Sequence, residues 1–135
     1  MGWCIYWDYK QEKNQPSSFP DKFVDEVKDI ITKSKIKLAS WDGDETAGID
    51  DIVSKTCIMF NGVYPESCET FRLCMSDPRG LGSDCCKTRG YNYSVICLAI
   101  LDLAMKYNII DDYSTDGGAE YEEVMKLYNT VIKNS

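Results

Sequence analysis

The chain has 135 residues, of which 44% are hydrophobic and 27% charged. This size and balance are typical of one globular domain over residues 1–135 and exclude disordered and fibrous proteins. The net charge of −7 repels phosphate backbones and anionic membranes, so we expect no nucleic-acid or membrane partner. The longest apolar stretch, residues 95–101, is far shorter than the ~20 residues that cross a bilayer. Because the first residues also lack an export signal, we expect a cytoplasmic protein.

Seven cysteines and the absence of histidine limit the possible chemistry. An odd number of cysteines without an export signal predicts reduced thiols, and no C-x-x-C pair of the zinc-binding kind is present. The acidic stretch 42–51 fails the EF-hand pattern, because Ala47 and Val53 stand where glycine and glutamate are needed. We therefore expect no metal and no cofactor. Lack of histidine removes the usual base of Ser and Cys hydrolases, which makes an enzyme less expected without excluding one.

The first half of the chain predicts short strands around one helix. Aromatic residues 3–7 predict a strand with Trp3, Ile5 and Trp7 on one face, and the polar segment 10–19 predicts a loop. A helix is expected over 20–34, because its apolar residues recur at helical spacing. These residues are Phe23, Val24, Val27, Ile30 and Ile31. A short strand over 36–40 and an acidic loop over 41–51 follow.

The second half predicts a hairpin, a buried helix, a strand and a closing helix. Apolar residues 56–60 predict a strand followed by a turn at Asn61-Gly62, and alternation over 68–75 predicts the return strand. Residues 92–106 are apolar nearly all round and predict the central helix. A strand over 109–115 and a helix from 116 to 133 complete the order β-α-(β)-β-β-α-β-α. This order predicts an α+β fold with a small mixed or antiparallel sheet of 3–5 strands and about three helices.

The arginines suggest a candidate site, because all three lie between residues 72 and 89. Arginine suits capture of carboxylate or phosphate, and the segment 85–90 is expected to be a loop before the central helix, whose free N–H groups favour anions. Loops at one end of the sheet should bring six residues together, namely Glu69, Cys86, Lys87, Thr88, Arg89 and Asp116. A salt-bridge network and a reactive Cys86 are the alternative interpretations of the same residues.

Three short motifs in the second half of the chain resemble a group of small proteins of phages, large DNA viruses and some bacteria. They are Glu69-Thr70-Phe71, Cys86-Lys87-Thr88 followed by Tyr93, and Thr115-Asp116-Gly117 before the closing helix. The chain departs from that pattern at Ser94, Thr115 and Tyr121, where aspartate, serine and tryptophan are usual. The resemblance implies no fold, activity or catalytic residue.

Two functional hypotheses follow from the sequence. The leading hypothesis is a non-enzymatic accessory or binding protein, of viral or mobile-element origin, whose acidic surface contacts another protein in the cytoplasm of the host cell. The alternative is a protein or enzyme that binds a small anionic ligand, such as a phosphate compound, through the Cys86–Arg89 segment and Asp116.

Overall fold

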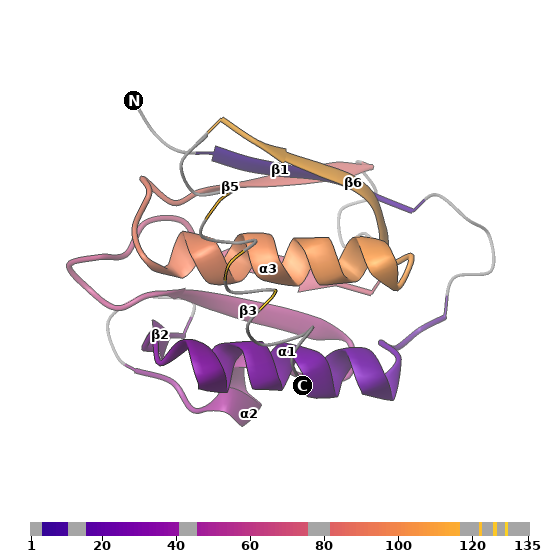
Figure 1. The fold of residues 1–135 in the computed structure, drawn as a ribbon, viewed down its shortest axis with the longest axis horizontal. Coiled ribbons are helices and arrows are strands. Elements are labelled where there is room, and N and C mark those ends of the chain that lie inside the picture. Colours follow the sequence, from indigo (N-terminus) through magenta and orange to yellow (C-terminus); the bar gives the residue numbers. More distant parts are fainter. Residues whose placement is uncertain are drawn as a thin grey trace.

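The computed structural model describes residues 4–10, 16–40, 46–75 and 82–116, together with Glu122, Lys126 and Asn129. Within these residues the chain forms three helices and two three-stranded antiparallel sheets, which confirms the predicted α+β class (Figure 1). The elements are β1 (Cys4–Tyr9), α1 (Asp21–Ser34), β2 (Leu38–Ala39), α2 (Ile49–Ile52), β3 (Cys57–Gly62), β4 (Phe71–Cys74), β5 (Ser83–Lys87), α3 (Tyr93–Lys106) and β6 (Ile110–Thr115). The predicted closing helix lies outside the described residues, apart from three isolated positions.

The first sheet has the order β5-β1-β6, with β1 in the centre. Residues Ile5, Trp7 and Tyr9 of β1 are buried, so its alternation confirms the predicted strand. Strand β5 corrects the prediction of a loop over 85–90, because Cys85, Cys86 and Lys87 pair antiparallel with β1. The residues of β5 are mostly small or polar, and only one of the five is buried. The strand is therefore recognised only by its pairing with β1.

The second sheet has the order β2-β3-β4, and here Asn61 and Gly62 correct the expected turn. Both residues belong to β3, and the chain turns beyond them, around a cis Tyr64-Pro65 bond. The Asn61 side chain is buried and bonds both backbone groups of Cys68, at 2.9 and 3.1 Å. Gly62 is required because a Cβ there would collide with the Glu66 carbonyl and the Tyr93 ring. Asn61 therefore organises the connection from inside the strand.

A disulfide joins Cys57 of β3 to Cys74 of β4, so the prediction that all seven cysteines are reduced is wrong. The two residues face each other in the strand register, and their Cα atoms lie 4.1 Å apart. Such a pair is within reach of a disulfide once the strands align, although 17 positions separate the cysteines in sequence. The other five cysteines form no disulfide.

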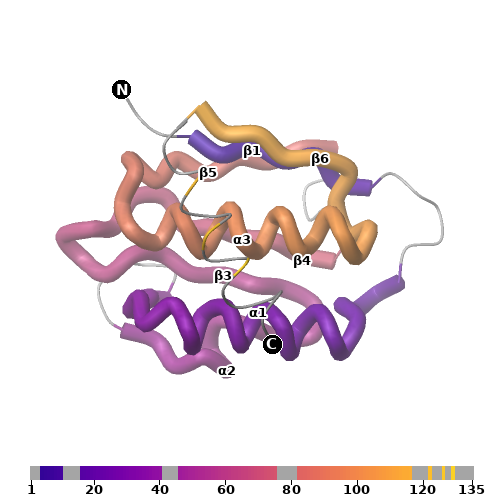
Figure 2. The backbone as a smooth tube through the Cα atoms, viewed as in Figure 1, coloured from indigo at the N-terminus to yellow at the C-terminus, as the bar shows by residue number. Residues whose placement is uncertain are grey.

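The two longer helices pack side by side against the sheets (Figure 2). Ten of the fourteen residues of α3 are buried, which confirms its prediction as the central helix. Helix α1 buries one stripe, including Phe23, whose ring meets Tyr107 at 5.5 Å beyond the end of α3. One hydrophobic cluster joins both helices and both sheets. Among the described residues, no helix has the length and apolar character needed to span a membrane.

The acidic stretch 41–51 is only partly a loop. Residues 41–45 lie outside the description, whereas Ile49–Ile52 form the short helix α2. Gly48 begins this helix in an extended conformation, and the buried Ile52 anchors it to the core. Asp50 and Asp51 stand exposed in its first turn, where carboxylates suit the helix dipole.

Candidate functional site

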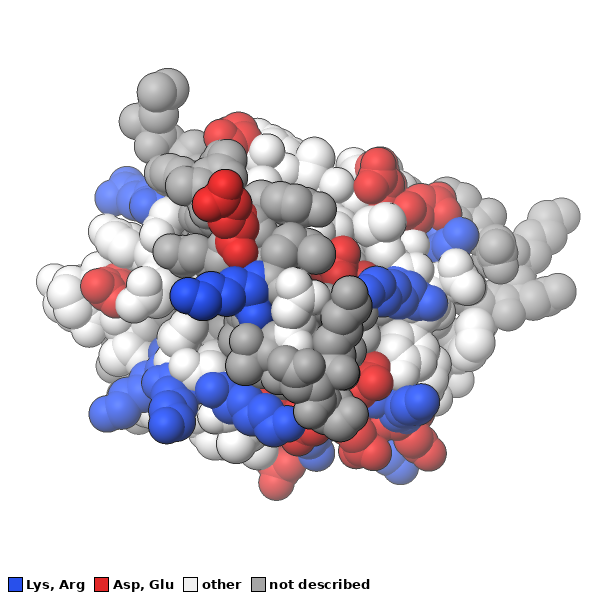
Figure 3. Space-filling view, viewed as in Figure 1, with Lys and Arg blue, Asp and Glu red and all other residues white. Residues whose placement is uncertain are grey.

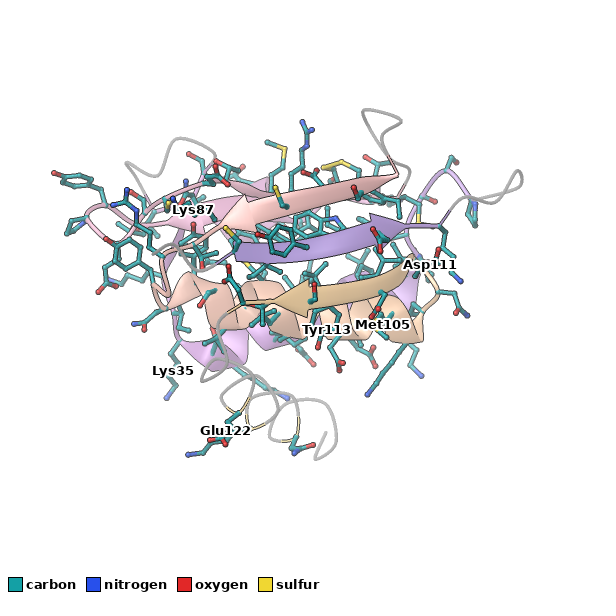
Figure 4. All side chains as sticks on the ribbon, turned by 90° about the horizontal axis from the view of Figure 1, so that it is seen from above. Lys35, Lys87, Met105, Asp111, Tyr113 and Glu122 are labelled. Atoms are coloured by element: carbon teal, nitrogen blue, oxygen red, sulfur yellow. A yellow bond between two sulfur atoms is a disulfide. The ribbon has the colours of Figure 1, made fainter. Side chains whose placement is uncertain are left out.

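The candidate site is the outer side of the β5-β1-β6 sheet. Because side chains alternate along a strand, burial of Ile5, Trp7 and Tyr9 turns their neighbours outward. The outward residues, here called the open face, are Cys4, Tyr6 and Asp8 of β1, Ser83, Cys85 and Lys87 of β5, and Asp112 and Ser114 of β6. Figure 4 looks onto this face, and no helix or strand of the described residues covers it.

A groove of about 470 Å³ crosses the open face between two rows of side chains. The register places Cys85, Tyr6 and Ser114 in one row, and Ser83, Asp8 and Asp112 in the other. All six side chains are exposed, and Tyr6 retains 46% of its accessible surface. The floor is the backbone of Trp7 and its strand neighbours, since their side chains turn to the other side of the sheet. Three strands therefore build one groove.

The first wall of the groove combines an aromatic ring with a thiol. A hydrogen bond with the Cys4 side chain raises the pKa of the Tyr6 hydroxyl above its ordinary value. Burial, followed by the charge of Asp84, raises the pKa of the Cys85 thiol. Both groups are therefore neutral at pH 7, and the Cys85 thiol is a poor nucleophile because little thiolate forms. This wall suits contact better than covalent chemistry.

The second wall of the groove is acidic. Asp8 and Asp112 lie directly opposite each other on neighbouring strands. The Asp112 carboxylate accepts the Tyr113 N–H at 2.9 Å, and neither aspartate forms an ion pair within the described part of the chain. Figure 3 shows acidic side chains along the upper edge of the molecule and again along its lower edge, with basic side chains between and beside them.

Three of the predicted site residues come together at the end of the sheet where β1 begins. The Glu69 carboxylate accepts the Lys87 N–H at 2.7 Å, and the Asp116 carboxylate accepts the Cys4 N–H at 2.7 Å. Because Lys87 pairs with Cys4, these four residues form a continuous row across the strand ends. Both carboxylates thus hold backbone groups of the sheet edge.

The other three predicted residues do not join that row. Cys86 and Thr88 are fully buried, and the Cys86 thiol donates to the Glu69 carbonyl at 3.4 Å. Arg89 stands in an exposed turn with a left-handed backbone (φ 56°). Neither Lys87 nor Arg89 forms an ion pair within the described residues, so the alternative salt-bridge network is not formed there.

A second hollow lies beside the start of α3. Its volume is about 240 Å³, and its ionisable lining residues are Lys35, Lys37 and Glu66. Asn92 and Tyr93 of the helix start also line it. The helix start therefore also borders lysines that follow α1. An anion site at Lys87 and Arg89 stays a prediction.

Sequence reasoning missed the residues of the groove, although one signal was present. The alternation of residues 4–9 predicts that Tyr6 and Asp8 point away from the core. Their partners on β5 and β6 depend on the pairing of distant strands, which local patterns do not specify. No group of three metal-ligating side chains gathers within the part of the chain that the structure describes.

Comparisons with known proteins find no matching family model, no matching curated protein and no matching solved structure. The resemblance to phage and viral proteins therefore stays a prediction from three short motifs.

Proposed function

We propose that this chain is a non-enzymatic binding protein that contacts a partner protein through the open face. The observation that carries the proposal is the groove of about 470 Å³, whose two walls are exposed side chains from three strands. Its volume lies within the ~300–1,000 Å³ of ligand-binding pockets. A groove on a sheet that no described element covers offers a partner both shape and polar contacts (Figure 4).

The chemistry of the thiols supports binding over catalysis. Cys86, the thiol favoured from the sequence, is fully buried, and Cys85 on the groove wall has a raised pKa. A nucleophilic cysteine needs the opposite properties, namely access to substrate and a lowered pKa. The expected cytoplasmic location and the viral or mobile-element origin belong to this proposal as well.

Two exposed tyrosines allow a matched crosslinking test. Tyr6 stands on the groove wall, whereas Tyr64 lies in the β3–β4 connection and retains 72% of its surface. The photo-crosslinker p-benzoylphenylalanine replaces either tyrosine, and the protein is irradiated in cells that naturally produce it. We expect one dominant protein adduct from position 6 that position 64 does not give. The same set of adducts from both positions, or none from position 6, would contradict a docking role for the open face.

A loss-of-binding variant completes this test. Ser114 faces Tyr6 across β1 and β6, so Ser114→Arg fills the groove from its own wall. The variant should abolish the adduct from position 6 and leave the melting temperature unchanged, because residue 114 is exposed. An adduct that persists in this variant would contradict docking in the groove, which is the observation that carries the proposal.

A further inference from the structure

We infer that the groove receives an extended basic segment of the partner, with an arginine side chain seated between Tyr6 and the facing pair Asp8 and Asp112. This inference rests on the proposed function and names the chemistry of the partner. Charge complementarity is its main support, because two carboxylates meet on one wall and the described residues that line the groove include no basic side chain.

Within the described part of the chain, neither of the facing aspartates pairs with a cation. Asp8 and Asp112 are exposed, directly opposed and outside every ion pair of the described residues. Like charges directly opposite on neighbouring strands disfavour the sheet. A cation placed between them attracts both carboxylates and removes their repulsion, so this wall favours a basic occupant.

The lysines that the structure describes on this sheet do not supply that cation. Lys10 pairs with Asp111 at 2.9 Å, and Lys87 lies beyond Cys85 along β5, outside the groove lining. Figure 4 shows Lys87 and Asp111 at opposite ends of the sheet. Among the described residues, no basic side chain is placed to supply this charge, and the inference assigns it to the partner.

The opposite wall explains the choice of arginine. The exposed Tyr6 ring offers its face to a guanidinium, which stacks on aromatic rings and is weakly hydrated. Its planar N–H groups also match carboxylate oxygens, so one guanidinium can contact ring and carboxylates together. A lysine ammonium satisfies the charge but lacks the planar stacking surface.

The test uses a fluorescein-labelled nine-residue peptide in which three arginines alternate with glycine and serine. Its matched control carries citrulline for each arginine, which keeps the shape and removes the charge. Fluorescence anisotropy should show binding of the arginine peptide about tenfold tighter than the citrulline peptide, as expected for charge-assisted hydrogen bonds. Equal binding of the two peptides overturns the inference.

Variants locate the binding on the groove. Asp8→Asn with Asp112→Asn removes two charges from the wall, and Asp50→Asn with Asp51→Asn removes two exposed charges from α2. The first pair should weaken binding about tenfold and the second less than about twofold. An equal loss in both pairs means attraction by net charge alone and overturns the inference. Tyr6→Leu should weaken binding as well, and circular dichroism verifies that each variant is folded.

The same variants separate this inference from the proposed function. If the crosslink from position 6 persists in the Asp8→Asn, Asp112→Asn variant, the open face binds its partner without a basic segment. The inference then fails and the docking role stands. If Ser114→Arg also leaves the crosslink unchanged, both fail.

Discussion

Tyr93 makes the strongest test of how the two sheets are connected. Its ring is buried, and its hydroxyl donates to the Glu69 carbonyl at 2.7 Å and reaches the Lys87 carbonyl at 3.4 Å. Glu69 also donates its own N–H to Lys87 at 3.0 Å, so the hydroxyl closes the junction between β4 and β5. Tyr93→Phe leaves the ring in place and removes this donor. We expect a loss of about 1–2 kcal/mol in the free energy of unfolding at pH 8.

The pH dependence of the free energy of unfolding gives a second test of Tyr93. Burial, followed by the nearby charges of Cys86 and Cys97, raises the pKa of the Tyr93 hydroxyl above the ordinary value of 10.0. The unfolded chain therefore ionises this group near pH 10 while the folded chain keeps its proton. The folded state therefore binds one proton more than the unfolded state above this pH. The contribution of the Tyr93 hydroxyl to the free energy of unfolding is complete below about pH 10 and falls above it by up to ~1.4 kcal/mol per pH unit.

Urea unfolding at pH 8, 10 and 11 measures both effects. The difference in stability between the parent and Tyr93→Phe should be largest at pH 8 and shrink towards zero near pH 11, because only the parent loses this contribution. Tyr64→Phe is the control, since that ring is 72% exposed. A difference that stays constant from pH 8 to pH 11 would refute the assignment of a buried, neutral hydroxyl.

Further predictions concern the core and the cysteines. Leu98→Ala, at a fully buried position of α3, should cost about 2–5 kcal/mol in urea unfolding, whereas a cost below about 0.5 kcal/mol would mean that α3 is not central. Thiol counting in denaturant without reductant should give five thiols per chain, and a count of seven would contradict the Cys57–Cys74 disulfide. Cys57→Ser with Cys74→Ser should lower stability by about 3 kcal/mol, the estimate for a loop of this length.

The helices and the central strand were predictable because their burial is periodic. Helix α1 repeats apolar residues on one stripe, and β1 alternates buried and exposed residues along its length. Both patterns follow from local geometry alone. Strand β5 lacks such a pattern, since only Cys86 of its five residues is buried, and it exists through hydrogen bonds to β1. The prediction of a turn at Asn61-Gly62 was wrong for a related reason. The buried side chain of Asn61 forms hydrogen bonds with the backbone of Cys68, which the local sequence does not indicate.

The candidate site was predictable in its position more than in its chemistry. Sequence reasoning correctly places Glu69, Lys87 and Asp116 at one end of a sheet. It does not predict that the Glu69 and Asp116 carboxylates accept backbone N–H groups, because those hydrogen bonds depend on which segment of the chain lies opposite. Thr88 shows the same limit, since a polar residue before a helix is expected at the surface and is fully buried here. The groove arises only once three distant strands share a register.

The different contacts of Asp116 and of the facing pair Asp8 and Asp112 lead to a last prediction. Asp116 holds the backbone of Cys4, whereas Asp8 and Asp112 repel each other across β1 and β6. If the facing pair serves binding, Asp112→Asn should raise the melting temperature slightly, because repulsion ends and the amide oxygen can still accept the Tyr113 N–H. Asp116→Ala should lower the melting temperature, because the Cys4 N–H loses its acceptor. A scanning calorimetry experiment that finds Asp112→Asn less stable than the parent would mean that the acidic wall supports the fold, and the reason to assign it to a partner would disappear.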